Sequence, residues 1–121
     1  MSVCFSGAYT DSNLARKVYN YFETKCYPDI ANYVVELYHC DLSDDNVKGW
    51  QEKNDDEFLL HIDANLDEDE YIKTIFHELV HCIQDIRGIS DNNSRECEAY
   101  KLEQLFYDNF MLTEASKVSS K

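Results

Sequence analysis

The sequence predicts a single α+β domain, and three observations support this prediction. The chain has 121 residues, which suits one domain with one modest core. Hydrophobic residues make up 44% of it, so the chain can bury that core without help. Segments with helical periodicity alternate with short β-branched and aromatic runs that are typical of strands. We expect an N-terminal helix, a small twisted sheet, a second helix and a closing C-terminal helix.

The first half of the chain contains one expected helix and one expected strand. Thr10 and Asp11 are suited to cap a helix over residues 11–25, which ends before Pro28. Residues 33–39 are β-branched and aromatic and predict a strand. Residues 41–57 are acidic and polar around the single Trp50, and we expect them to cross the surface without regular structure. A second strand is expected over residues 58–62.

The following helix is the best-defined element, with expected limits at about residues 67 and 87. Asp67 is suited to cap its start, and Glu70, three residues later, completes a capping box. Gly88 provides the left-handed residue that commonly ends a helix, and Ile89 can fold back on Ile83.

A last helix is expected to begin at the capping cluster of residues 91–94 and to run to about Leu112. The segment from Thr113 to Lys121 is small and polar, and we expect a mobile tail. The expected domain therefore covers residues 1–112, followed by a tail over residues 113–121.

Charge and cysteine content restrict the partners and the compartment. The formal net charge of −13 comes from 24 acidic and 11 basic residues, and it disfavours direct contact with nucleic acid or an anionic membrane. The five cysteines form an odd set without a CxxC pair, as expected of free thiols in a reducing compartment. The N-terminus lacks the pattern of a signal peptide, and no segment is long and apolar enough to span a bilayer. We therefore expect a cytoplasmic protein.

The motif with the clearest chemistry is His77-Glu78-Leu79-Val80-His81. Residues four apart lie on the same face of a helix, so His77 and His81 can bind one metal ion together. Glu78 points in another direction, where it can act as a general base on zinc-bound water. The two histidines lie roughly 140–180° around the helix from the first member of its apolar stripe, so they point away from the core, toward a cleft or solvent. The stripe consists of Ile72, Ile75, Phe76, Leu79, Ile83 and Ile86. The alternative interpretation is two surface histidines beside an unrelated glutamate.

A catalytic zinc needs a third protein ligand, and the sequence offers two candidates for it. No histidine follows His81, whereas Glu96 and Glu98 both lie in the first turn of the last expected helix. They flank the apolar face of that helix on opposite sides, so periodicity alone does not choose between them.

Residues 58–106, with the HExxH motif and the later Glu96-Cys97-Glu98-Ala99, resemble the compact gluzincin metallopeptidases of the ImmA/IrrE type. The resemblance implies a minimal zincin-like domain with zinc as cofactor and a protein or peptide as substrate. It assigns His77, His81 and Glu96 as metal ligands and Glu78 as the catalytic base. It also assigns Tyr100 to the position that supports a ligand histidine, where the family has Asp or Asn.

Several other features have competing interpretations. Cys82 follows His81, but its place beside the apolar stripe favours a buried thiol over a ligand or nucleophile. His61 lies in the strand that borders the cleft in zincins, where it could stabilise a transition state.

The alternative to a peptidase is a non-enzymatic acidic interaction or inhibitor protein that keeps a structural zinc. An intact Glu78 argues against it. The substrate and the oligomeric state are not readable from the sequence.

Overall fold

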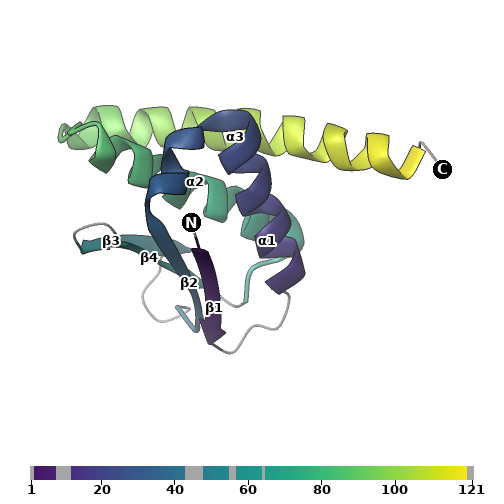
Figure 1. Ribbon diagram of the computed structural model, residues 1–121, viewed down its shortest axis with the longest axis horizontal. Coiled ribbons are helices and arrows are strands. Elements are labelled where there is room, and N and C mark those ends of the chain that lie inside the picture. The colour runs from purple at the N-terminus through teal and green to yellow at the C-terminus, as the bar shows by residue number, and fades with distance from the viewer. Residues whose placement is uncertain (1, 8–11, 43–47, 55–56, 64, 120–121) are drawn as a thin grey trace.

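The computed structural model describes residues 2–7, 12–42, 48–54, 57–63 and 65–119, and it confirms the α+β class (Figure 1). Its longer elements, in chain order, are β1 (Ser2–Gly7), α1 (Ser12–Tyr21), β2 (Val34–Cys40), β3 (Gly49–Asn54), β4 (Glu57–Asp63), α2 (Glu68–Ile86) and α3 (Asn92–Ser119). Two short helical segments, η1 (Phe22–Cys26) and η2 (Pro28–Asn32), connect α1 to β2. None of the helices in these ranges combines the length and the apolar character needed to cross a membrane.

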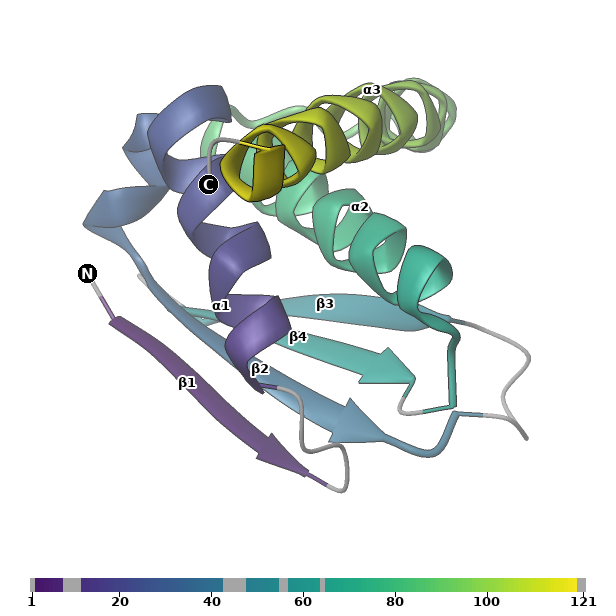
Figure 2. The same ribbon diagram turned by 90° about the vertical axis from the view of Figure 1, so that its right-hand side faces the viewer.

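The four strands form one mixed sheet in the order β1-β2-β4-β3. Strands β1, β2 and β4 are parallel, and β3 pairs antiparallel with β4. The helices all lie against one face of this sheet (Figure 2). In this strand order β4 is an interior strand and β3 lies at the edge, whereas the zincin resemblance predicts that the strand over residues 58–62 borders the cleft.

The core lies between the sheet and α2. Alternate residues of β2 and β4 are buried, as expected for strands that have one covered face. Their counterparts on α2 are residues of the apolar stripe that the sequence predicted. The fully or almost fully buried members of these sets are Val35, Leu37, Phe58, Leu60, Ile62, Ile72, Ile75, Phe76, Leu79 and Ile83. Packing of this stripe on the sheet directs the opposite face of α2 toward α3.

Both ends of α2 form as the sequence predicts. The Asp67 side chain accepts a hydrogen bond from the Glu70 backbone N–H at 2.9 Å. At the other end Gly88 has a φ of 73°, and Ile89 donates from its backbone N–H to the carbonyl of Gln84 at 2.9 Å. This six-to-one bond across a left-handed glycine is a Schellman motif, which ends the helix and reverses the chain.

Other boundaries differ from the expectation. Residues 2–7 form a strand that the sequence did not indicate, and β3 lies inside the segment expected to be irregular. Helix α3 continues to Ser119, so the expected end near Leu112 is wrong. The Thr113 hydroxyl donates a hydrogen bond to the Asn109 carbonyl, and Oε1 of Glu114 lies 3.7 Å from Nζ of Lys17 on α1. The expected caps Thr10 and Asp11 fall outside the described residues, as do residues 120–121.

Candidate metal centre

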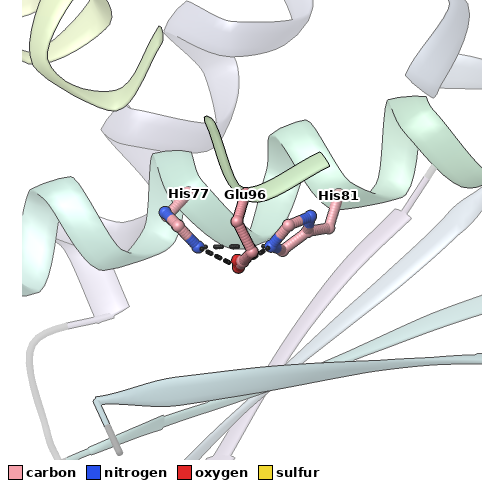
Figure 3. A group of neighbouring side chains, drawn as sticks. All are labelled: His77, His81 and Glu96. Carbon is pink, nitrogen blue, oxygen red and sulfur yellow. Dashed lines mark hydrogen bonds and ion pairs between the residues drawn. The ribbon is translucent and has the colours of Figure 1, made fainter. Parts of the chain in front are cut away.

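Three potential ligand atoms meet between α2 and α3 (Figure 3). The Nε2 atoms of His77 and His81 are 3.2 Å apart. Glu96 places Oε1 at 3.3 Å from Nε2 of His77 and at 3.1 Å from Nε2 of His81. The structure thus brings the predicted histidine pair together with Glu96, and the three residues form a group that could hold a metal ion.

The backbone around the Schellman turn explains why Glu96 reaches the histidines. The turn sends the chain back, so that α3 begins beside the end of α2 and runs along it (Figure 1). Asp91 caps α3 by accepting from the backbone N–H of Ser94 at 3.0 Å. Arg95 then binds Asp85 of α2 at 2.7 Å, while Asp85 also accepts from Gln51 of β3 at 2.6 Å. This contact joins both helices and the edge strand close to the ligand group.

The two histidines are more buried than the sequence indicated. Both are 9% exposed, because α3 covers the face of α2 that points away from the core. The histidines point away from the sheet, as predicted, and of the expected cleft or solvent they face a cleft between helices, where His77 lines a cavity. Desolvation strengthens the interaction of such a site with a charged ligand.

Each histidine also uses its second ring nitrogen. Nδ1 of His77 lies 2.8 Å from Oε1 of Glu103, and Nδ1 of His81 lies 2.7 Å from Oε1 of Gln84. The amide nitrogen of Gln84 donates to the Arg95 carbonyl and to Glu98, so the amide orientation is fixed by two acceptors. Both Nδ1 atoms therefore face acceptors and carry the proton in the neutral imidazoles.

This choice of tautomer leaves both Nε2 atoms as lone-pair acceptors. Together with the Glu96 carboxylate they place three acceptors within 3.3 Å of one another, which is repulsive unless a positive charge lies between them. Burial opposes the protonated form of His77, but the hydrogen bond to Glu103 and the nearby carboxylates outweigh burial and raise its pKa. The group therefore has the electrostatic character of a cation site.

The spacing of the three atoms fits zinc. Ligand atoms at 2.0–2.1 Å from a tetrahedral ion are about 3.3–3.4 Å from each other, close to the separations of 3.1–3.3 Å found here. Two imidazoles and one carboxylate are a ligand set that zinc accepts. The second carboxylate oxygen of Glu96, Oε2, is buried and has no hydrogen-bond partner, although the side chain as a whole is 44% exposed. An ion beside this carboxylate would satisfy that oxygen.

Glu78 lies next to this group in a cavity of about 350 Å³. The cavity is lined by residues of β3, α2 and α3 and by the residue before β3. These are Lys48, Gly49, Glu70, Thr74, His77, Glu78, Glu96, Tyr100 and Glu103. Glu78 is 5% exposed, and burial, with contributions from Glu96 and Glu103 against that of His77, raises its pKa to about 7. A carboxyl group with such a pKa can accept and release a proton near neutrality.

The remaining candidates from the sequence lie outside the ligand group. Glu98 accepts from the Gln84 amide at 2.9 Å and so contacts the group indirectly. The Tyr100 ring lies 4.7 Å from the His77 ring, but Glu103 occupies the supporting position that the resemblance assigned to Tyr100. His61 stacks on Trp50 on the helix-free face of the sheet, so it does not border this cavity. Cys82 is fully buried, as predicted.

Glu103 and Gln84 are the site residues that the sequence analysis missed. Glu103 lies seven residues after Glu96, and Gln84 lies three residues after His81, so each shares a helix face with a ligand. This periodicity was a signal that could have identified both residues.

Comparison with protein-family models, curated proteins and solved structures finds no match for this chain. The description of the site therefore depends on its own geometry.

Proposed function

We propose that this protein is a zinc-dependent peptidase with a gluzincin-like site on a minimal zincin-like domain. The observation that carries the proposal is the convergence of His77, His81 and Glu96 beside a cavity that Glu78 also lines. Two histidines and a glutamate leave one position of a tetrahedral zinc open, as in catalytic rather than structural sites. The motif resemblance in the sequence supports the same ligands and the same base.

Glu78 is the proposed general base. It lies one residue from His77 on α2, lines the cavity and contributes no atom to the ligand group. In the proposed reaction its carboxylate takes a proton from the attacking water and delivers that proton to the leaving amine. Zinc, when bound, supplies Lewis-acid polarisation of the scissile carbonyl and of the water. Glu103 and Gln84 hold the two imidazoles in the tautomer that ligation requires.

The proposed substrate is a peptide segment that binds along β3. This strand is the edge of the sheet next to the cavity, and Gly49 at its start lines that cavity. An edge strand presents backbone donors and acceptors to which an extended peptide can add. The Lys48 ammonium lies 2.7 Å from Glu70 at the cavity, so its charge is already paired. We propose a specific protein as the substrate, rather than general digestion.

The test of the proposal has a metal stage and an activity stage. We expect about one zinc per chain in native mass spectrometry after expression with zinc, and loss of this zinc in His77→Ala, His81→Ala and Glu96→Ala. Glu98→Ala, on the same helical turn, removes an acceptor of the Gln84 amide but no ligand atom, so it should weaken zinc binding less than Glu96→Ala. Wild-type protein without metal would contradict the site.

In the second stage, Glu78→Gln should fold and keep zinc but lose proton transfer, which is worth typically about 10²–10⁴-fold in rate. Cleavage is measured on a peptide library by mass spectrometry, with wild type and Glu78→Gln side by side. Cleavage at equal rates by both would contradict the proposed mechanism. If Glu78→Gln instead has the same biological effect in cells as the wild type, hydrolysis is not the function. The second candidate, a non-enzymatic acidic interaction protein with a structural zinc, would then be favoured, and the net charge of −13 suits such a protein.

A further inference from the structure

The face of the sheet opposite the helices carries a second group of reactive side chains. The helices cover only one face, so the outward-pointing residues of β2, β3 and β4 lie together on the other (Figure 2). Register places Tyr38, His61 and Trp50 side by side on three adjacent strands. The His61 ring is stacked between the other two, at 5.4 Å from the Tyr38 ring and 3.9 Å from the Trp50 ring.

Both nitrogens of His61 have specific partners on this face. Nε2 lies 3.2 Å from Oε2 of Glu52, and Nδ1 lies 3.9 Å from Sγ of Cys40. Because a carboxylate only accepts hydrogen bonds, Nε2 carries the proton of the neutral ring and Nδ1 presents its lone pair to the thiol. A nucleophile, a base and a carboxylate that orients the base thus follow one another in space, in the arrangement that activates catalytic cysteines and serines.

The aromatic neighbours hold the imidazole in place. When His61 takes the thiol proton, the resulting imidazolium stays packed between the faces of Tyr38 and Trp50. Glu52 is exposed and adds a second favourable interaction at Nε2. The stacking also fixes the ring plane, so that Nδ1 remains directed at Cys40 without reorganisation.

We propose that Cys40 is a site of reversible S-thiolation, activated by His61 and Glu52. In this step Sγ attacks one sulfur of a low-molecular-weight disulfide while the thiol proton moves to Nδ1 of His61. The disulfide bond breaks, a mixed disulfide forms on Cys40, and the departing thiolate takes the proton from His61. One thiol and one disulfide enter the exchange, and one thiol and one mixed disulfide leave it.

Three further cysteines provide internal references. Cys82 is fully buried, and burial raises the pKa of Cys26 to about 11, so neither is suited to react. Cys97 is exposed, whereas Cys40 is only partly exposed. Exposure alone therefore predicts that Cys97 reacts first, and base assistance predicts that Cys40 does. The two outcomes separate the mechanism from simple accessibility.

The experiment treats the folded full-length chain with oxidised glutathione and follows each cysteine by peptide mass spectrometry. We expect Cys40 to be modified faster than Cys97, and this order to disappear in chain unfolded with urea. His61→Phe keeps an aromatic ring between Tyr38 and Trp50 but removes the base. It should slow modification of Cys40 by at least about 10-fold and leave the rate at Cys97 unchanged.

Two results would overturn the proposal: faster modification of Cys97 in the folded wild type, or an unchanged rate at Cys40 in His61→Phe. The first comparison needs no variant, so it holds even when His61→Phe fails to fold. Neither result bears on the proposed peptidase, because the metal group lies on the other side of the sheet and zinc content is measured separately.

Discussion

The two histidines of the candidate metal centre differ from ordinary buried histidines in the partners of their second ring nitrogens. A buried histidine in a core needs only one satisfied donor, whereas His77 and His81 each have an acceptor at Nδ1 and a converging acceptor at Nε2. Glu103 and Gln84 thus determine which nitrogen would face a bound ion. Glu103 is therefore a positioning residue, and the effect of replacing it can be measured as a decrease in metal affinity.

We expect Glu103→Ala to weaken zinc binding by about 10–100-fold, the usual effect of removing a carboxylate that orients a ligand histidine. Glu103→Gln should lose less affinity, because its amide oxygen can still accept from Nδ1 of His77. Competition titration with a chromophoric chelator measures both values. Gln104→Ala, at the next position on α3 and outside the site, is the control. Equal affinity in Glu103→Ala and Gln104→Ala would remove the positioning role.

At the scale of elements, the contact between β3 and α2 depends on a residue without a side chain. A Cβ atom at Gly49 would lie 2.9 Å from both the His61 carbonyl oxygen and Cγ2 of Thr74, and 3.3 Å from Cδ1 of Ile62. These distances are shorter than ordinary van der Waals contacts, and the carbonyl belongs to the paired strand. The edge strand therefore approaches α2 this closely because position 49 is glycine.

Gly49→Ala should accordingly reduce the free energy of unfolding by about 1–3 kcal/mol, the typical cost of overpacking. Urea denaturation followed by circular dichroism measures the change. Asn54→Ala, at the exposed far end of the same strand, should stay within about 0.5 kcal/mol of wild type. Wild-type stability in Gly49→Ala would show that β3 moves away from α2 without cost.

The elements that sequence reasoning predicted well are those defined by local signals. The Asp67 cap and the Gly88 terminus depend on hydrogen bonds within a few residues, so the limits of α2 could be read directly. Strand β3 could not, because its polar residues lack alternation and its formation depends on pairing with β4. The choice of Glu96 over Glu98 also required the path of α3 across α2, which periodicity does not contain.

For the whole molecule, we expect the candidate ligand group to couple metal binding to stability. Its ligands belong to two helices, and three acceptors lie close together there, so a bound cation should stabilise the folded state. Free zinc at 100 times its dissociation constant contributes about 2.7 kcal/mol, which corresponds to about 10 °C in Tm for a domain of this size. Calorimetry with zinc and with a chelator checks this shift. His81→Ala is the control and should melt at the same temperature under both conditions.

The ligands are also close in the chain, since all three lie between residues 77 and 96, on two helices joined by a single Schellman turn. The parallel pairing of β1 with β2 instead joins residues as distant as Ser2 and Val34. Loop closure over short separations costs less entropy, and local contacts form faster than long-range ones. The metal group can therefore assemble in a helical hairpin before the sheet is complete. Zinc would then act on the rate of folding, and not only on the stability of the folded protein.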